Sequence, residues 1–117
     1  LSIVQKLVAV YKLWHEFLPH IPKTLRYTLG EKIDNCFIDT LELIFVAQYA
    51  KQEQKLPILQ RANTKFDTLK FFTQLLWETR GISTNQYGAL GEKLSEAGKM
   101  LGGWLRKIMI QSQRAEQ

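Results

Sequence analysis

The sequence of 117 residues predicts an all-α fold, an antiparallel up-down-up-down four-helix bundle. Apolar residues recur at helical spacing through four segments, and prolines and one polar turn separate these segments. Strictly alternating apolar runs and Pro-Gly hairpin signals do not occur, so strands are not expected. We expect one domain over residues 1–117, with helices over about 2–18, 22–54, 57–80 and 83–112.

The first predicted helix, residues 2–18, is defined by an apolar stripe and by the prolines that follow it. Pro19 and Pro22 end the helix because proline cannot continue the backbone hydrogen bonding. Pro22 suits the first turn of the next helix. The expected inner face consists of Val4, Leu7, Val8, Tyr11, Trp14 and Leu18.

The second predicted helix, residues 22–54, changes character along its length. From Leu41 to Tyr49 apolar residues point to nearly every side, which predicts a covering partner in addition to the bundle itself. The stripe expected to face the bundle consists of Leu25, Leu29, Ile33, Phe37, Leu41, Ile44 and Gln48.

Local signals define the ends of the third and fourth helices. We expect Pro57 to open the third helix and Gly81 to end it as a cap residue. Ser83 with Gln86 three residues later has the form of a capping box and opens the fourth helix. The expected inner face of the third helix consists of Leu59, Ala62, Phe66, Leu69, Phe72 or Thr73, and Leu76.

The fourth helix carries two stripes side by side. The apolar stripe consists of Tyr87, Leu90, Leu94, Ala97, Leu101, Leu105 and Ile108, and the small-residue stripe of Gly88, Gly91, Ser95, Gly98 and Gly102. Leu101 and Leu105 keep the apolar register across Gly102-Gly103, so the helix is expected to continue there. Helical glycines cost stability unless a neighbour comes close. We therefore assign helix packing, within the bundle or at a subunit seam, to Gly91, Gly98, Gly102, Gly103 and Trp104.

The sequence offers no catalytic or metal-binding constellation. It has one cysteine, Cys36, and two histidines, without Glu-x-x-His or zinc-finger spacing. Cys36 stands in an apolar stretch that favours a small buried side chain with a raised pKa. We therefore expect no enzyme activity, no cofactor and no metal. The longest apolar run is too short to cross a bilayer, and a cytoplasmic location is expected.

The chain is moderately basic, with a formal net charge of +5 and a pI near 9.4. The positive excess lies on the third and fourth helices as a diffuse surface. Such a surface suits phosphate contacts, whose affinity depends on salt and little on sequence. The candidate contacts on these helices are Arg61, Lys65, Lys70, Arg80, Arg106 and Lys107.

Three segments resemble a known family. "IPKTLRYTLGEKI" resembles its Pro-Lys-x-x-Arg-Phe/Tyr-x-Leu-Gly opening of the second helix, "ANTKFDTLKFFTQLLWE" its third helix and "LSEAGKMLGGWLRK" its last. Together they resemble Avd, the accessory variability determinant of diversity-generating retroelements. The resemblance extends to the close relatives of Avd, which are the proteins encoded in 23S ribosomal RNA intervening sequences.

The resemblance implies a function that spacing alone does not reveal. Avd-type proteins form a homopentameric barrel, bind the retroelement reverse transcriptase and associate with RNA and DNA. The complex makes mutagenic complementary DNA from a template repeat, the step that underlies mutagenic retrohoming. The resemblance thus implies a non-enzymatic accessory protein encoded by a bacterium, an archaeon or a phage. The alternative is an intervening-sequence type of interaction protein without a reverse transcriptase partner.

Few residues carry over from the family individually. Lys23 and Arg26 match the Pro-Lys-x-x-Arg motif, and Lys70 falls where the third helix of the family often has a basic residue. One turn later Gln74 stands where the family often has an arginine. The resemblance therefore implies reverse transcriptase or nucleic acid contacts at Lys23, Arg26 and Lys70, with Gln74 as a departure.

Overall fold

A computed structural model describes residues 2–116, and in this range the chain forms helices and no strand. The all-helical prediction is confirmed. The four long helices are α1 (Ile3–Phe17), α3 (Glu31–Tyr49), α4 (Gln52–Glu78) and α5 (Thr84–Ala115). Between α1 and α3 lie a 3₁₀ turn, η1 (Leu18–His20), a short helix, α2 (Lys23–Leu25), and a π-helical turn, η2 (Arg26–Gly30).

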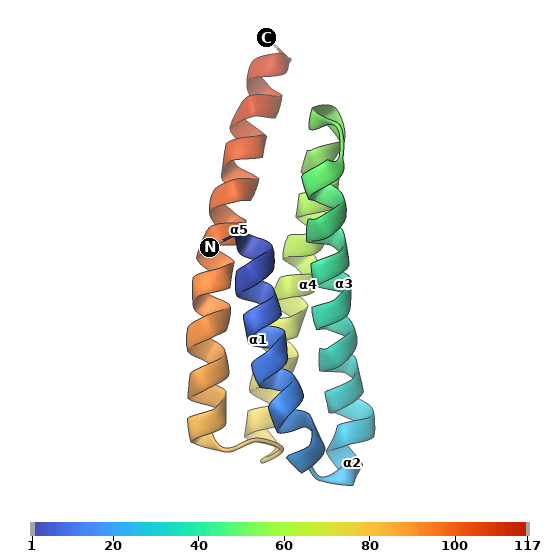
Figure 1. Ribbon diagram of the computed structural model, residues 1–117, viewed down its shortest axis with the longest axis vertical. Coiled ribbons are helices and arrows are strands. Elements are labelled where there is room, and N and C mark those ends of the chain that lie inside the picture. The colour runs from blue at the N-terminus through green and yellow to red at the C-terminus, as the bar shows by residue number, and fades with distance from the viewer. Residues whose placement is uncertain (1, 117) are drawn as a thin grey trace.

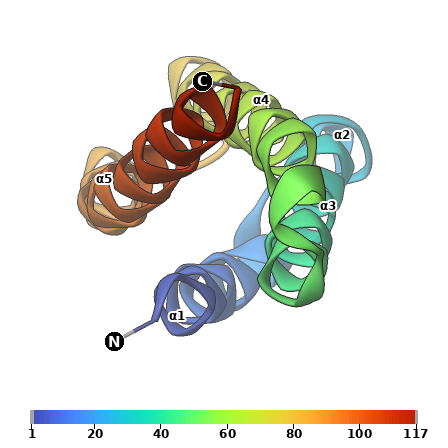
Figure 2. The ribbon, with the colours of Figure 1, turned by 90° about the horizontal axis from the view of Figure 1, so that it is seen from above.

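The helices form an elongated bundle with extents of 53 × 22 × 21 Å. Figure 1 shows the chain descending through α1, rising through α3, descending through α4 and rising through α5. Seen from above, α3 and α5 lie on opposite sides of the bundle (Figure 2). The helix α1 lies alongside only part of the bundle length, so α3, α4 and α5 extend beyond its N-terminal end (Figure 1).

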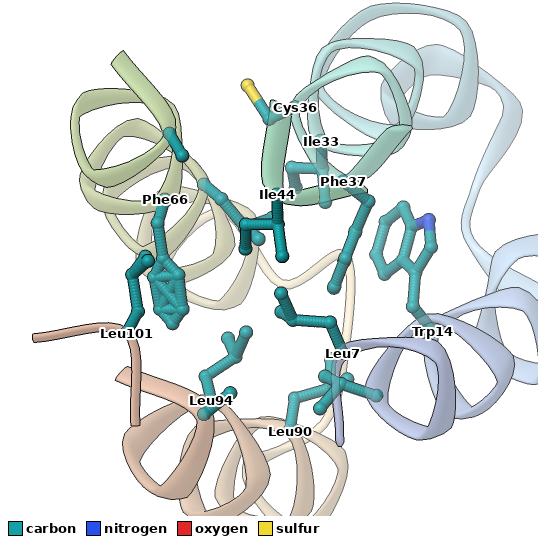
Figure 3. Packing of buried hydrophobic residues seen from close by; sticks show 14 of the residues in the cluster. Leu7, Trp14, Ile33, Cys36, Phe37, Ile44, Phe66, Leu90, Leu94 and Leu101 are labelled. Carbon is teal, nitrogen blue, oxygen red and sulfur yellow. The ribbon is translucent and has the colours of Figure 1, made fainter. Parts of the chain in front are cut away.

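A single cluster of buried apolar side chains fills the space between the helices (Figure 3). Trp14, Phe37 and Phe66 are its largest fully buried members. Trp14 stacks on Phe37 with ring centroids 6.1 Å apart, and its Nε1 donates a hydrogen bond of 3.1 Å to Asp34 Oδ1. The inner face predicted for the third helix is confirmed, with Thr73 buried rather than Phe72.

The inner face predicted for the first helix is partly wrong. The buried residues of α1 are Ile3, Leu7, Val10 and Trp14, and Val8 lies outside the core cluster. The helix packs against α3 and α5. The residues that face these two neighbours, and are therefore buried, recur at positions i, i+4, i+7 and i+11. Its start is a capping box formed by Ser2 and Gln5, which the apolar stripe of the helix does not predict.

The continuous second helix predicted over residues 22–54 is also wrong, because α3 ends at Tyr49. Ala50 and Lys51 are extended, and α4 begins at Gln52. Lys55 Nζ donates hydrogen bonds to the carbonyls of Ala47 (2.6 Å) and Gln48 (3.3 Å), which satisfies the end of α3. Lysine at this place therefore closes the turn between the two helices.

Pro57 does not open the third helix but lies inside the second turn of α4. The carbonyl that would accept a hydrogen bond from residue 57 belongs to Glu53, which is exposed and can bind water instead. Proline is therefore tolerated at this early position.

The turn from α4 to α5 differs from the predicted glycine cap. Arg80 N–H donates to Trp77 O (2.9 Å) and Gly81 N–H donates to Leu76 O (2.8 Å), the two hydrogen bonds of a Schellman motif. The residue in the left-handed region is Arg80, with φ 67°, whereas Gly81 has no positive φ. Gly81 is required for space, because a Cβ there would overlap the buried side chain of Leu76.

The helix α5 runs without interruption from Thr84 to Ala115, so the predicted continuation through Gly102-Gly103 is confirmed. The capping box at its start is also confirmed, since Gln86 N–H donates to Ser83 Oγ at 3.1 Å. The helix extends three residues beyond the predicted end at 112.

We predict opposite effects for two neighbouring substitutions in the α4–α5 turn. Arg80→Gly should raise the free energy of unfolding by up to about 1 kcal/mol, because glycine adopts a positive φ without strain. Gly81→Ala should lower it by about 1–3 kcal/mol through overlap with Leu76. Urea denaturation measures both.

Arg80→Ala is the control, since it removes the arginine side chain and keeps the strained backbone. A stability gain for Arg80→Ala equal to that of Arg80→Gly would contradict the role assigned to the backbone.

Candidate interaction surfaces

The small-residue stripe of α5 is open rather than packed. No heavy atom of a neighbouring helix lies within 4 Å of the place where a Cβ would stand at Gly88, Gly91, Gly102 or Gly103. At Gly98 the ring of Phe66 would be 3.5 Å away, an ordinary van der Waals contact. Close approach of a helix inside the bundle therefore does not account for these glycines.

A hollow between α4 and α5 brings Lys70 next to the stripe. Its lining includes Lys70, Thr73, Tyr87, Gly91 and Leu94. Lys70 Nζ lies 3.6 Å from Asp67 Oδ1 and 5.3 Å from the ring centroid of Phe66. The side chain is half exposed, so these contacts position the cation loosely and leave it accessible to an anion.

Arg61 and Lys65 lie one turn apart on α4 and line another hollow together with Pro57, Gln60 and Thr64. Lys65 Nζ is 3.4 Å from Asp39 Oδ2 of α3, and both side chains are roughly half exposed. A surface pair of this kind is weak, so an anionic ligand can compete for Lys65.

Other predicted cations lie at separate places. Arg80 is exposed beside His20 and Pro22, where the α1–α2 and α4–α5 turns meet. Next to them Trp77 stacks on Tyr87, with centroids 4.7 Å apart and an interplanar angle of 9°. Lys23, Arg106 and Lys107 are exposed as well. The structure therefore spreads the predicted binding residues over the bundle and does not gather them into one site.

The outer side of α3 carries large exposed apolar residues, which are not among the residues predicted to bind a partner. Ile38, Phe45, Val46 and Tyr49 are exposed, with Tyr49 at 78%. The sequence contains a signal for this exposed face. Apolar residues point to nearly every side of residues 41–49, which predicts a covering partner in addition to the bundle. Within the described chain only one side of this segment is covered.

Comparison with known proteins decides the family. A family model described as bAvd-like matches residues 1–108. The chain belongs to the bAvd-like family. No curated protein matches it. The resemblance predicted from the motifs is confirmed, and the family is one of accessory proteins without catalytic activity. The relation to 23S ribosomal RNA intervening-sequence proteins stays a prediction.

In this bAvd-like chain Arg26, the arginine of the Pro-Lys-x-x-Arg motif, has a structural role. Arg26 Nε donates to Ile21 O at 3.1 Å, and its Nη2 donates to Pro19 O at 2.7 Å and to Ile21 O at 2.9 Å. One guanidinium thus ties the turn after α1 to the start of η2. The side chain is half buried, and its use as a partner contact stays a prediction.

The described residues of the bAvd-like chain hold no group of three or more His, Cys, Asp or Glu side chains suited to a metal ion. Cys36 is buried, and this burial raises the pKa of its thiol, although Lys32 and Lys65 oppose the shift. A raised pKa reduces the thiolate fraction that a nucleophile requires.

None of the helices described for the chain is long and apolar enough to pass through a membrane.

We predict that Arg26→Lys destabilises the bAvd-like fold. Lysine offers one ammonium group and cannot reproduce three hydrogen bonds to two carbonyls, so the free energy of unfolding should fall by about 1–3 kcal/mol. Urea denaturation measures the change. Lys23→Ala, at an exposed neighbouring position, serves as the control and should change stability by less than about 0.5 kcal/mol. Equal stability of Arg26→Lys and the parent would contradict the clamp.

We also predict that Cys36 resists alkylation in the folded protein. Burial and the raised pKa both oppose thiolate attack on iodoacetamide. Mass spectrometry at pH 8 should show modification at least about tenfold slower than in urea-unfolded chain. Equal rates in the two states would show that the thiol is accessible.

Proposed function

We propose that this bAvd-like chain is a non-enzymatic accessory protein of a diversity-generating retroelement. It binds the reverse transcriptase of the element together with template RNA and complementary DNA, and it supports mutagenic synthesis of that DNA. The observation that carries the proposal is the family match over residues 1–108, which covers all of the bundle except the end of α5.

The charge distribution supports the nucleic acid part of the proposal. The chain has a net charge of +5, and exposed cations stand on α4 and α5 at Arg61, Lys70, Arg106 and Lys107. Separated cations of this kind contact phosphates along a backbone and do not read base edges. The proposed binding is therefore largely independent of sequence and falls steeply with salt.

The proposed assembly is a homopentameric barrel of bundles in the cytoplasm. It is supported by the exposed apolar face of α3 and by the open glycine face of α5, two surfaces that the bundle itself leaves uncovered. A ring repeats the basic surface several times, which raises the avidity for a long polyanion without any new contact.

The proposed contact with the polymerase and its RNA centres on Lys70. The hollow between α4 and α5 holds this lysine beside an open helix face, where a backbone or phosphate can approach closely. Arg61 lies on the same helix two and a half turns earlier, so it projects from the opposite side of α4 and forms a second basic patch with Lys65.

We predict that the double substitution Arg61→Glu with Lys70→Glu weakens binding to the complex of template RNA with the reverse transcriptase encoded beside the gene. The affinity should fall at least about tenfold, and the salt slope should shrink by about 2, because two phosphate contacts are lost. Fluorescence anisotropy over a salt series measures both quantities.

The double substitution Lys12→Glu with Lys51→Glu is the matched control, since it makes the same change of net charge at two exposed residues outside the proposed surface and should bind with a smaller loss. Binding of RNA without any binding of the reverse transcriptase would instead favour the intervening-sequence type of interaction protein. Equal affinities of the parent and the double variant would remove Arg61 and Lys70 from the proposed surface.

A further inference from the structure

A row of cations follows the boundary between α3 and α4. Lys65 Nζ of α4 lies 3.4 Å from Asp39 Oδ2 of α3, and Arg61 lies one turn earlier on the same side of α4. Lys32 of α3 stands at the other end of the row, with its Nζ 5.8 Å from the ring centroid of Phe72 of α4. Within residues 2–116 neither Lys32 nor Arg61 is part of an ion pair, so both are available to an anion.

The row is nearly straight, because α3 and α4 lie side by side and run in opposite directions (Figures 1 and 2). Lys65 and Phe72 are seven residues apart on α4, which corresponds to a rise of about 10 Å. Arg61 lies about 6 Å beyond Lys65, so the row is about 16 Å long. Positive charges spread along a line match the phosphates of a nucleic acid backbone better than one compact anion.

An exposed aromatic ring stands at the Lys32 end of this row. Phe71 is 61% exposed, and its ring makes an edge contact with Phe72 at a centroid distance of 5.2 Å. Phe72 packs against the core, so it holds the neighbouring ring from one side. A large exposed ring beside cations is a platform on which a nucleobase can stack. The bases of a duplex already stack on one another, so such a ring favours a single strand.

Between its two ends the row carries oxygens that are suited to accept hydrogen bonds. The hydroxyl of Thr64 donates to Gln60 O at 3.1 Å, and that of Thr68 donates to Thr64 O at 3.0 Å. The lone pairs of these hydroxyls, like the carboxylate of Asp39, therefore suit a donor on the ligand. The sugar-phosphate backbone of DNA has no donor, whereas each ribose of RNA has a 2′-hydroxyl that donates. These oxygens favour RNA.

We infer that the α3–α4 boundary binds a single strand of RNA, with phosphates on Lys32, Lys65 and Arg61 and an unpaired base stacked on Phe71. The inference rests on the proposed function, whose template is RNA, and it adds a site and a binding mode. A phosphate competes successfully with Asp39 for Lys65, because an ion pair between half-exposed side chains is weak. Contacts to the backbone and to the π face of a base do not read sequence, so different templates can bind.

Fluorescence anisotropy of the full chain with a labelled single-stranded RNA of about 12 nucleotides tests the stacking contact. Phe71→Leu should lower the affinity about tenfold, because leucine keeps an apolar side chain but cannot stack on a base. Phe71→Trp is the matched variant and should bind at least as tightly as the parent, since indole also stacks. Circular dichroism of both variants checks that the helices are intact. Parental affinity of Phe71→Leu would overturn the stacking contact and leave Phe71 as an apolar contact for a protein.

Salt and strand type test the other contacts. Arg61→Gln with Lys65→Gln should reduce the slope of log affinity against log salt by about 1.4, since each phosphate contact with a single strand contributes about 0.7. Phe71→Leu should leave this slope unchanged, because stacking releases no counterion. DNA of the same sequence, and RNA paired with its complement, should each bind at least about fivefold more weakly than single-stranded RNA.

The possible results separate this inference from the proposed function. RNA affinity that is unchanged in both the Phe71→Leu and the Arg61→Gln/Lys65→Gln variants would overturn the site and leave the accessory role intact. DNA bound as tightly as RNA would overturn the assignment of RNA as the ligand. A parent chain that binds the reverse transcriptase but no RNA would overturn the inference, and one that binds neither would overturn the proposed function together with it.

Discussion

The structure depends on the packing of α4 between α3 and α5. Six buried residues of α4 form a stripe that contacts both neighbours, with Phe66 at its centre against the small side of α5 at Gly98. Protein interiors are close-packed, so the size of the side chains at a contact fixes the distance between the two helices. A Cβ at Gly98 would meet the ring of Phe66 at 3.5 Å, an ordinary van der Waals contact, so Phe66 and not the glycine sets the distance between α4 and α5 here.

The limited length of α1 leaves one end of the bundle with three helices instead of four (Figure 1). Trp14 and Leu7 complete the core where α1 lies, whereas α3, α4 and α5 continue beyond it (Figures 1 and 3). Among the described residues every buried side-chain nitrogen and oxygen has a hydrogen-bond partner. The proposed function uses the surfaces, with basic residues on α4 and α5 and apolar residues on α3.

The candidate surface could be predicted from the sequence only in part. Charge counting finds Arg61, Lys70 and Arg106 because exposed cations need no tertiary context. The motif also points to Arg26, but the carbonyls of Pro19 and Ile21 that bind its guanidinium come from the preceding turn, and their convergence depends on the folded connection. The apolar surplus at residues 41–49 predicts a covering partner, while the identity of the exposed side chains depends on where α4 lies.

By itself the sequence determined the helical class, the capping box at Ser83, the continuation of α5 through Gly102-Gly103 and the family, because these depend on local periodicity, local hydrogen bonds and short motifs. The tertiary structure decided the break after Tyr49, the left-handed Arg80 and the open space beside Gly102. Each of these three features results from contacts between helices or from the geometry of the turns that join them. A residue pattern along one helix cannot specify how close its neighbours come.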